Sequence, residues 1–433
     1  MPAFGLLDCN NFYASVERVF DARLHRRPVV VLTGGENGII IARSQEAKNL
    51  GIGMAQPVFE VRDIIRKNGV IVRTANFELY ADMSSRVMGL IEEFSPDIQV
   101  YSIDEAFFLV SGSVPLETFG EKVRTRITCG TGLPVSLGFA PTKTLAKLAN
   151  HLGKVSGKVV DLYNASKPEI EHVLAETPVG EIWGVGPNTT KKLIKQGITT
   201  ALALRNLDLR WTAKKLSVVG VRTVLELRGT SCYSLTNTPD ELSGRQSVTC
   251  SRSFSNPVID KSEMRRAVSG YVTRAAERLR RLGFAAGRLT VSVSTNRFTN
   301  PDEFYGNYAV YTSHSPSDST SELISWAMNC LDRIYHPGLK YKKAGVTLTY
   351  LIPYKTSNAR LIDEQECVRS HNLMNVIDKM NLRWGRDTVL YAAVLEKNLR
   401  REKDELKSSR SGSHTTRYEE MLVLNDDAVS RQY

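Results

Sequence analysis

Two acidic residues stand side by side inside an apolar run at residues 100–110, VYSIDEAFFLV. Adjacent residues of a regular strand point to opposite faces, so Asp104 and Glu105 reach one ligand only where the strand begins or turns. Ser102 favours such a turn. One interpretation is a solvated turn at a strand end. The other is a metal site, because hard cations such as Mg²⁺ take oxygen ligands, and it requires a third carboxylate from elsewhere in the chain.

Asp8 is a candidate for that third carboxylate. It follows a short apolar segment, residues 4–7, which predicts a strand. Asn10 or Asn11 is then placed to cap a helix. Apolar residues recur behind this cap at helical spacing and predict one buried helix face: Phe12, Val16, Val19 and Phe20. Asp8 therefore lies where a strand ends and a helix begins, although an exposed loop aspartate explains it equally well when the residue is taken alone.

Basic residues outnumber acidic ones, 57 to 46, which gives a formal net charge of +11 and a pI near 9.3. This balance favours partners that carry negative charge, nucleic acid before a membrane surface. No apolar run reaches the length of a membrane span, and the first residues do not form a secretory signal. The six cysteines include no C-x-x-C pair, which indicates reduced thiols in a cytosolic setting without a zinc site.

Basic residues near helix starts predict contacts with phosphate groups. Arg43 and Lys48 flank the start of a helix, where they either hold phosphates or form a solvated face. Lys143, Lys147 and Lys154 share one face of a later helix because of their spacing. We expect an anion opposite them, such as a DNA backbone or a triphosphate, because three like charges on one face repel one another. The chain lacks the P-loop spacing, so a P-loop ATPase is disfavoured.

A glycine pair in the middle of the chain predicts a helix-hairpin-helix. Gly184 and Gly186 precede Pro187, which suits the first position of a helix, and Lys191 follows on that helix. Glycines let backbone N–H groups approach a phosphate closely, so the motif favours binding to a DNA backbone without reading its sequence. A plain pair of antiparallel helices is the alternative.

The region from residue 247 to 353 predicts a small α/β sandwich, in the order strand, helix, strand, strand, helix, strand. In its second strand Arg288 alternates with apolar residues, which predicts a polar sheet face that lies on DNA. Beyond residue 353 the periodicity fades, which predicts a charged tail that is disordered or docks a partner.

These segments together resemble the Y-family of translesion DNA polymerases, and within it the UmuC-type branch. The resemblance covers about residues 3–350 and, more faintly, the tail. The motifs follow the family's order: DCNNFYASVE, ARSQEAKNLG, ELYADMSSRV, YSIDEAF, TKTLAKLAN, IWGVG and YKKAGV. The combination of YSIDEAF with an upstream D-x-N-x-F-Y-A is specific, whereas neither half is sufficient alone.

The resemblance implies an α+β right-hand polymerase fold with a ferredoxin-like palm, small fingers, a helical thumb with the helix-hairpin-helix, and an α/β little finger. The implied division places the palm at residues 1–33 and 76–167, the fingers at 34–75, the thumb at 168–232, a linker at 233–246, the little finger at 247–353 and a partner-binding tail at 354–433.

The resemblance also implies roles for individual residues. Asp8, Asp104 and Glu105 would bind two Mg²⁺ ions, with the Cys9 carbonyl as a backbone ligand. Tyr13 matches the steric gate that excludes ribonucleotides. The other implied nucleotide contacts are Phe12, Arg43, Lys48 and Lys154, and the implied DNA contacts are Lys143, Lys147, Gly184, Gly186, Lys191, Arg252 and Arg288. Gln45 departs from the tyrosine of many relatives, which puts that contact in doubt.

The implied function is error-prone synthesis past damaged bases in the bacterial SOS response, by a cytoplasmic, nucleoid-associated enzyme. Its substrates would be primer–template DNA and deoxynucleoside triphosphates, and its partners a processed UmuD dimer, a RecA filament and the sliding clamp. The clamp motif is weak, because its candidate, NARLI at residues 358–362, lacks the usual glutamine and aromatic residue.

Two rival functions use similar folds. A catalytically silent DNA-binding scaffold has no need for Asp8, Asp104 and Glu105 together. A nucleotide cyclase-like enzyme also carries two metal-binding acids on a ferredoxin-like core. The basic sandwich and the glycine-rich hairpin favour a DNA substrate instead.

Overall fold

The computed structural model describes residues 2–34, 38–111, 115–235, 247–298, 303–354, 364–385, 387–394, 410–412, 414–417 and 420–421. Contacts divide the chain into two compact units, Met1–Asn237 with Arg400–Tyr433, and Thr238–Leu399. The break falls inside the predicted linker, and the predicted tail is divided between the units. The finer division into palm, fingers and thumb stays a prediction. None of the described helices is long and apolar enough to cross a membrane.

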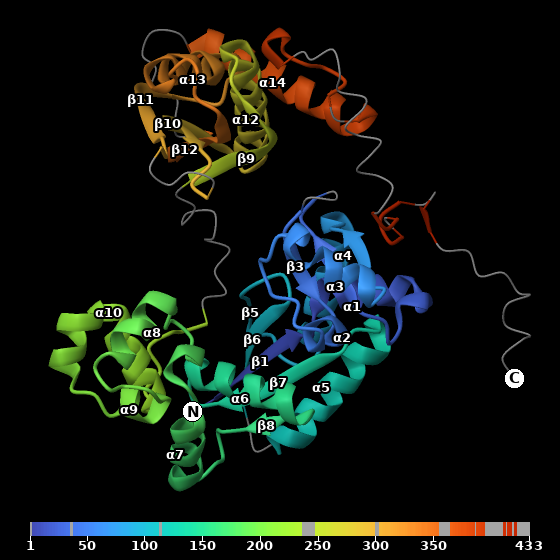
Figure 1. The fold of residues 1–433 in the computed structure, drawn as a ribbon, viewed down its shortest axis with the longest axis vertical. Helices are drawn as coiled ribbons and strands as arrows, with labels where there is room; N and C mark the ends of the chain where they lie inside the picture. The colour runs from blue at the N-terminus through green and yellow to red at the C-terminus, as the bar shows by residue number, and fades with distance from the viewer. Residues whose placement is uncertain are drawn as a thin grey trace, which may run out of the picture. The chain divides into compact units, whose positions relative to one another are not determined.

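A five-stranded sheet, in the predicted palm, forms the centre of the first unit (Figure 1). The order is β5-β6-β1-β7-β8, antiparallel except for the pair β7–β8. The strands are β1 (Ala3–Cys9), β5 (Ile98–Val100), β6 (Glu105–Val110), β7 (Val135–Ala140) and β8 (Val160–Asp161). The central strand β1 is buried along its whole length, which confirms the strand predicted at residues 4–7.

Side chains alternate along β1 between two hydrophobic cores. Leu7 and Cys9 join one core with α1, α4 and α5. Phe4 and Leu6 join another core with α6 and the helices that follow it. These helices are α1 (Phe12–Phe20), α4 (Phe77–Glu92), α5 (Leu116–Thr131) and α6 (Lys143–Ser156). Asp8 shares the parity of Phe4 and Leu6, so its carboxylate lies on the α6 side of the sheet.

Close approach to β7 fixes the position of α6. A Cβ atom on Gly138 would lie 2.2 Å from the backbone nitrogen of Asn150, so only glycine permits this contact. The buried Asn150 amide donates hydrogen bonds to the carbonyl oxygens of Leu6 (3.1 Å) and Ser136 (2.8 Å). Thr142 caps the helix, because its side-chain oxygen accepts a hydrogen bond from the Leu145 backbone N–H in the first turn. The helix is therefore held in one rotation against β1.

The predicted side-chain cap of α1 is wrong. Asn11 occupies the cap position with φ 53° and makes no capping hydrogen bond, and the Asn10 side chain instead accepts a hydrogen bond from Ser136 (2.9 Å). The sharp turn out of β1 requires a left-handed residue, a conformation that asparagine tolerates.

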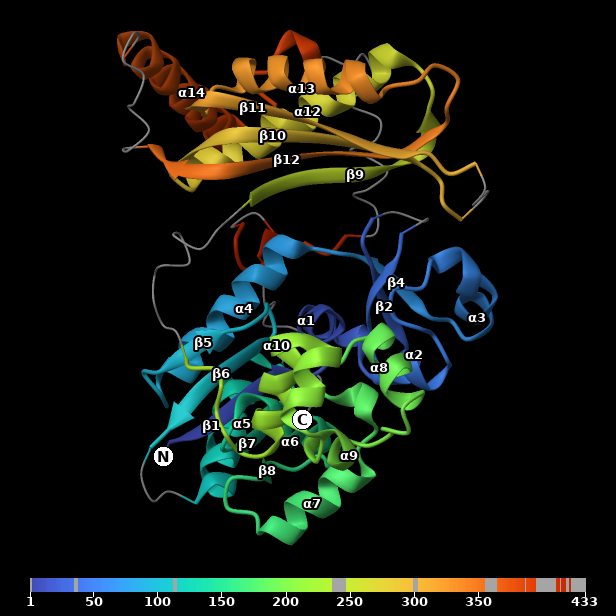
Figure 2. The same ribbon diagram turned by 90° about the vertical axis from the view of Figure 1, so that its left-hand side faces the viewer.

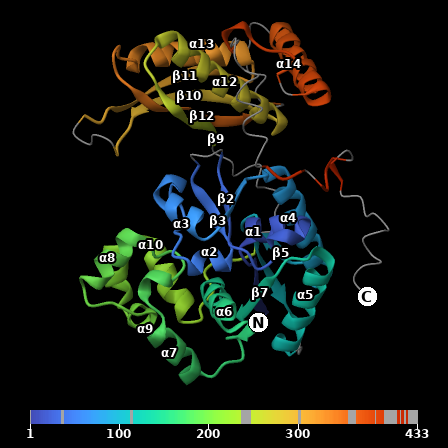
Figure 3. The same ribbon diagram turned by 45° about the vertical axis from the view of Figure 1, so that its right-hand side comes forward.

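A three-stranded sheet with short helices lies between residues 22 and 74, which takes in the predicted fingers, 34–75, and the end of the first predicted palm segment (Figure 3). Its order is β3-β2-β4, with β2 (Val29–Leu32), β3 (Ile40–Arg43) and β4 (Ile71–Thr74). The helical segments are η1 (Ala22–Leu24), α2 (Gln45–Asn49), η2 (Val58–Val61) and α3 (Arg62–Lys67). Ser44 caps α2, so the chain passes directly from β3 into that helix.

Short helices make up the predicted thumb: α7 (Lys167–Glu176), η3 (Val179–Glu181), α8 (Pro187–Ile194), α9 (Ala201–Arg205) and α10 (Leu209–Leu227). They share the core of α6. Glu226 of α10, fully buried, accepts hydrogen bonds from the backbone N–H groups of Thr144 (2.9 Å) and Cys232 (2.7 Å). A carboxylate thus lies at the amino-terminal end of α6, where the helix dipole favours negative charge.

The second unit is an antiparallel sheet of order β11-β10-β12-β9 with α12 and α13 on one face (Figure 2). Its strands are β9 (Ser247–Val258), β10 (Phe284–Thr295), β11 (Gly306–Ser317) and β12 (Tyr341–Pro353), and its helices are α12 (Lys261–Arg281), α13 (Thr320–Ile334), α14 (Glu364–Trp384) and η5 (Ala392–Val394). The predicted order of strands and helices through residue 353 is confirmed.

Regular structure continues beyond residue 353, because α14 follows, so this part of the predicted tail is folded. Its Asp378 carboxylate pairs with both ends of the buried Arg280 guanidinium, at 2.7 and 2.8 Å. His371 bonds to Asp318 and stacks on Tyr354 with ring centroids 3.7 Å apart. These polar anchors hold α14 in the second unit.

Candidate active site

Asp8 and Glu105 are direct partners in the pairing of β1 with β6. Glu105 shares the parity of Phe107, which lies in the core on the α6 side, so both carboxylates lie on that side of the sheet. Asp104 sits in the bend before β6, and its carbonyl oxygen accepts a hydrogen bond from the Cys9 backbone N–H (2.9 Å). The fold thereby brings the three predicted carboxylates to one edge of the sheet.

Ser102 builds the turn that holds the acidic pair. Its hydroxyl oxygen accepts hydrogen bonds from the backbone N–H groups of Asp104 (3.4 Å) and Glu105 (3.1 Å), and its O–H donates to Asp104 Oδ1 (2.6 Å). The predicted turn at Ser102 is confirmed. No group of three or more His, Cys, Asp or Glu side chains converges on a metal position in the described part of the chain, because Asp104 is turned toward Ser102.

Two lysines of α6 neutralise the other two carboxylates. Lys147 Nζ lies 3.0 and 3.2 Å from the Glu105 oxygens, and Lys154 Nζ lies 2.7 Å from Asp8 Oδ2. The two lysines are two helical turns apart, so they share one face of the helix. Each of these two carboxylates therefore has one ammonium partner on α6.

Lys143 does not join this arrangement, and the prediction that it contacts an external anion is wrong. Its side chain is 3% exposed and donates to the Gln99 side chain and to the Ser234 carbonyl oxygen (2.9 Å). Burial lowers the pKa of Lys143. The residue therefore anchors the first turn of α6 inside the protein.

Asp8 has a strongly perturbed carboxyl group. Burial, against the attraction of Lys154 and with the help of a hydrogen bond with Glu105, raises the pKa of Asp8 to about 7. Asp8 is only 5% exposed, so little water stabilises the charge of its carboxylate. A second cation at this position would favour the ionised form.

Three predicted nucleotide-binding cations lie close to Asp8. Burial lowers the pKa of Lys48, and the neighbouring charges of Arg43 and Lys154 lower it further. Arg43 donates one N–H to the Ile52 carbonyl oxygen (2.6 Å), and its buried Nε has no hydrogen-bond partner. Positive charges therefore lie close together here without a carboxylate for each of them, which is typical of a phosphate-binding site.

Gln45 is the first residue of α2. It is exposed at the start of α2 and donates to the Asn49 side chain (3.0 Å).

Aromatic rings surround Tyr13 on α1. Tyr13 stacks on Tyr80 of α4 with ring centroids 4.4 Å apart and meets the edge of Phe77 at 5.9 Å. Burial raises the pKa of Tyr13, and the Asp104 charge raises it further, which places this ring beside the carboxylates. Phe12 is 4% exposed and packs in the core. Its side chain is therefore not available for the nucleotide contact that was predicted for it.

Tyr101 and Trp183 belong to the site, although the sequence analysis did not select them. The Lys147 ammonium lies 4.7 Å from the Tyr101 ring centre and 5.7 Å from that of Trp183. The Trp183 indole N–H donates to the Tyr101 hydroxyl (3.1 Å), and Tyr233 packs against Trp183. Both residues stand inside motifs used for the resemblance, so attention to aromatic rings beside the acidic pair and the glycine pair would have found them.

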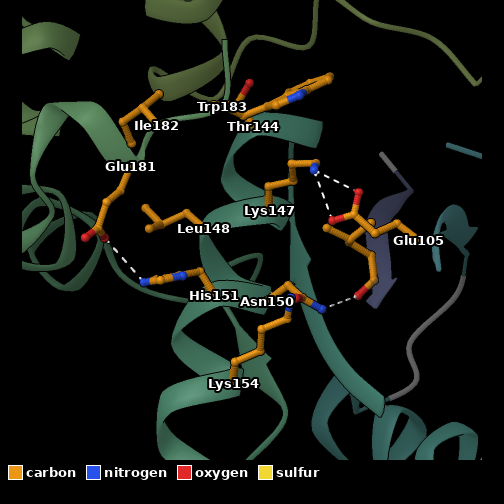
Figure 4. A pocket seen from close by; sticks show the side chains of 11 residues that line it. Glu105, Thr144, Lys147, Leu148, Asn150, His151, Lys154, Glu181, Ile182 and Trp183 are labelled. Carbon is orange, nitrogen blue, oxygen red and sulfur yellow. Dashed lines mark hydrogen bonds and ion pairs between the residues drawn. The ribbon is translucent and has the colours of Figure 1, made fainter. Parts of the chain in front are cut away.

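A pocket of about 230 Å³ opens beside α6 (Figure 4). Glu105 and Lys147 line one side, and the ion pair between His151 and Glu181 (3.3 Å) lines the other. The volume is below the roughly 300 Å³ at which small-molecule pockets begin, so it does not enclose a nucleotide.

The predicted hairpin contacts are exposed. Gly184 has φ +89°, Gly186 precedes α8, and Lys191 is exposed on that helix. Arg288 lies on the polar face of the second unit's sheet, over the Tyr350 ring at 4.4 Å. Arg252 shares the parity of the buried Val248 and pairs with the buried Ala344, so it lies on the opposite, helix-covered side. The polar face therefore includes Arg288 and not Arg252.

Family models match three parts of the chain. The impB/mucB/samB family matches residues 7–151, and the C-terminal domain of the same family matches residues 245–361. A domain of unknown function matches residues 371–424. Residues 358–362, the candidate clamp motif, lie outside the described residues.

Curated relatives cover nearly the whole chain. Protein UmuC of Salmonella typhimurium is 40% identical over 97% of this chain and 99% of that protein, and Protein SamB of the same species is 41% identical over 87% and 90%. DNA polymerase IV of Pelotomaculum thermopropionicum is 29% identical over 90% and 94%. These values confirm the UmuC-type resemblance that the motifs predicted.

A solved structure titled "Insertion ternary complex of Dbh DNA polymerase" has a TM-score of 0.54 at 19% identity, over 81% of this chain and 99% of that one. This likeness confirms the predicted polymerase fold. By its family models and its relatives, the chain belongs to the impB/mucB/samB family.

Proposed function

We propose that this chain is an error-prone translesion DNA polymerase, which extends a primer 3′-end past damaged template bases by two-metal-ion catalysis. The observation that carries the proposal is the register pair of Asp8 and Glu105, beside Asp104 and a cluster of phosphate-binding cations. A scaffold gains nothing from the buried Asp8 carboxylate beside two others at this edge, because burying charge costs stability.

The donor chemistry at this edge fits Mg²⁺. Three carboxylates and the Cys9 carbonyl oxygen offer the oxygen ligands that hard cations prefer. When bound, two such ions lower the pKa of a primer 3′-hydroxyl and stabilise a leaving pyrophosphate. The raised pKa of Asp8 is consistent with a site designed for a stronger cation than Lys154. The Lys147 and Lys154 ammonium groups each pair with one of these carboxylates, Glu105 and Asp8.

Arg43, Lys48 and Lys154 would bind the triphosphate of the incoming nucleotide. Their charges lie close enough to perturb one another, and a triphosphate would relieve this repulsion. Tyr13 would lie under the sugar as the steric gate. Its ring is backed by Tyr80, so a 2′-hydroxyl would meet a surface that cannot move away easily.

The DNA would follow the exposed cations and the hairpin. Lys191, Gly184 and Gly186 offer a charge and free backbone groups for phosphates, and Arg288 with its polar strand face suits a duplex backbone. A processed UmuD dimer, a RecA filament and the sliding clamp stay predictions for partners, as does a nucleoid-associated place in the bacterial cytoplasm.

The test is primer extension with Mg²⁺ and deoxynucleotides on a template with an abasic site. The wild type is compared with the Asp104→Ala/Glu105→Ala variant, each alone and with a UmuD′-type dimer and a RecA filament. The matched control is Glu117→Ala/Glu121→Ala, which removes two carboxylates from the first turns of α5. We expect extension past the lesion by the wild type and the control, and none by the active-site variant.

Intact DNA binding without extension in every partner condition would contradict the polymerase and favour the scaffold. Extension that survives in Asp104→Ala/Glu105→Ala would contradict the assigned metal ligands while leaving a polymerase in place.

A further inference from the structure

The described residues from Arg410 to Met421, here called the strap, belong to the first unit. They contact residues of its helices and strands that come much earlier in the sequence. Arg410 forms a parallel bridge with Thr74, the last residue of β4. The next contacts fall on α1 and on the start of α4. These are the two helices that carry Tyr13 and Tyr80.

Asn76, the cap of α4, binds the strap through both ends of its amide. Its NH₂ group donates to the carbonyl oxygens of Ser411 (3.0 Å) and Gly412 (3.1 Å). Its oxygen accepts from Arg410 Nη2 (2.6 Å) and from the Leu79 backbone N–H (3.4 Å). Asn76 is fully buried, so one side chain both starts the helix and seats the strap.

A chain of contacts runs from the strap to the Tyr13 ring. The Ser411 hydroxyl donates to Glu17 Oε1 (3.0 Å), and the Tyr80 hydroxyl donates to the same oxygen (2.5 Å). Glu17 is only 2% exposed. The Tyr80 ring in turn stacks on Tyr13 at 4.4 Å. Because Glu17 is buried, it needs these donors, and the strap supplies one of them.

Charged and aromatic contacts hold the other described residues of the strap. Glu78 lies 3.2 Å from Arg417 and 3.6 Å from Arg410, and it accepts a hydrogen bond from the Thr416 hydroxyl (3.2 Å). The His414 ring stacks on Phe20 of α1 with centroids 5.3 Å apart. The strap thus combines a polar centre with charged and aromatic edges, which is the composition of a specific contact surface.

We propose that the strap is a positioning element of the nucleotide site, which fixes Tyr80 through Glu17 and thereby sharpens the discrimination that Tyr13 makes between deoxyribose and ribose. This inference rests on the proposed function of Tyr13. It gives a role to the described residues between 410 and 421, which lie in the last part of the segment, residues 371–424, that the family model describes only as a domain of unknown function. The strap touches no reacting atom and acts through the Tyr13–Tyr80 stack.

The first test uses the full-length chain with the partners that primer extension requires. It measures the insertion efficiency of a ribonucleotide relative to the matching deoxynucleotide for Arg410→Ala/Ser411→Ala. We expect the ratio to rise about fivefold, which is the effect of losing about one net hydrogen bond. The matched control is Lys122→Ala/Thr125→Ala on the exposed side of α5, and its ratio is expected to stay within about twofold of the wild type.

Tyr13→Ala in the same assay separates the two proposals. A large rise for Tyr13→Ala together with no change for the strap variant overturns the strap and leaves the gate. No change for Tyr13→Ala overturns the gate, and the role of the strap in sugar selection falls with it.

A second variant, Thr74→Cys/Arg410→Cys, tests the strap without relying on the folding of the alanine variant. Its strap can be fixed or released in one folded preparation by forming or reducing a disulfide. Paired residues of neighbouring strands lie roughly 5 Å apart, within the range that a disulfide spans. We expect wild-type discrimination in the oxidised protein and about a fivefold loss after reduction, measured on one preparation. Equal ratios in both states, with the disulfide verified, would overturn the proposal.

Discussion

Asp8→Asn should stabilise the metal-free first unit at neutral and alkaline pH, although it removes a proposed metal ligand. Asp8 is 5% exposed, and its burial raises the pKa of the carboxyl group from 3.8 to about 7. In the window between these two values the folded chain holds a proton that the unfolded chain has released. Stability therefore falls as the pH rises through this window. Asparagine keeps the shape of the side chain and has no charge to bury.

The size of the effect follows from the pKa change. The change is about 3 pKa units, and each unit corresponds to about 1.36 kcal/mol, so the full cost of ionising Asp8 in the folded state is about 4 kcal/mol. About 1.5 kcal/mol of this cost is already present at pH 5, because the unfolded carboxyl group is ionised there. The stability advantage of Asp8→Asn should thus grow by about 2–3 kcal/mol between pH 5 and pH 8.5.

Urea unfolding in the presence of a chelator measures this difference. Trp183 and Trp211 lie in the first unit and Trp326 and Trp384 in the second, so a Trp326→Phe/Trp384→Phe background reports on the first unit alone. The unfolding free energy of the wild type and of Asp8→Asn is compared at each pH. Parallel pH profiles for the two proteins would refute the reasoning, because they would show that Asp8 ionises as easily in the fold as in the unfolded chain.

Three further changes test what holds the site in place. Gly138→Ala should cost about 3 kcal/mol or more in the unfolding free energy and abolish extension, because its Cβ would meet the backbone of α6 at 2.2 Å. Wild-type stability would contradict that close contact. Glu226→Gln should cost about 2 kcal/mol, since an amide NH₂ then faces a backbone N–H, and Glu176→Gln on the exposed end of α7 is the control. Asp378→Ala leaves the buried Arg280 guanidinium without its carboxylate partner, which should cost about 2–3 kcal/mol in unfolding free energy and lower the melting temperature of the second unit. Arg280→Met/Asp378→Leu removes both charges and should cost less. Equal losses would show that the ion pair is not the relevant contact.

The sequence predicted the acidic edge because local rules and long-range pairing agree there. The buried run at residues 4–7 is a strand, Ser102 makes the turn, and side-chain parity fixes which way Asp8 and Glu105 face. Lys147 and Lys154 were correctly placed on one face, since helical periodicity alone determines it. What the pattern could not supply was the partner of each cation. The lysines pair with the protein's own carboxylates in this structure.

Errors arose where tertiary contacts outweigh local pattern. Lys143 shares the helical spacing of Lys147 and Lys154, but hydrogen bonds to Gln99 and Ser234 hold its side chain in the interior. The helix α14 has weak amphipathic character, and its position depends on Asp378 meeting Arg280, about a hundred residues away in sequence. Likewise, no periodicity marks the strap, because its contacts are those of individual side chains with Asn76 and Glu17. Such contacts are a property of the fold and leave no repeat in the sequence.

Helix α6 connects these observations. Its amino-terminal end is fixed by Thr142 and by the Glu226 carboxylate, its middle is fixed by the contact of Gly138 with Asn150, and its exposed face presents the lysines to the carboxylates. The opposite face of the same sheet carries α1 and α4, where Tyr13 is backed by Tyr80. Different helix layers thus hold the groups that manage charge and the group that would read the sugar. A change behind either helix layer should therefore alter one property of the reaction and spare the other: Glu226 variants should affect the rate of insertion, and strap variants the choice of sugar.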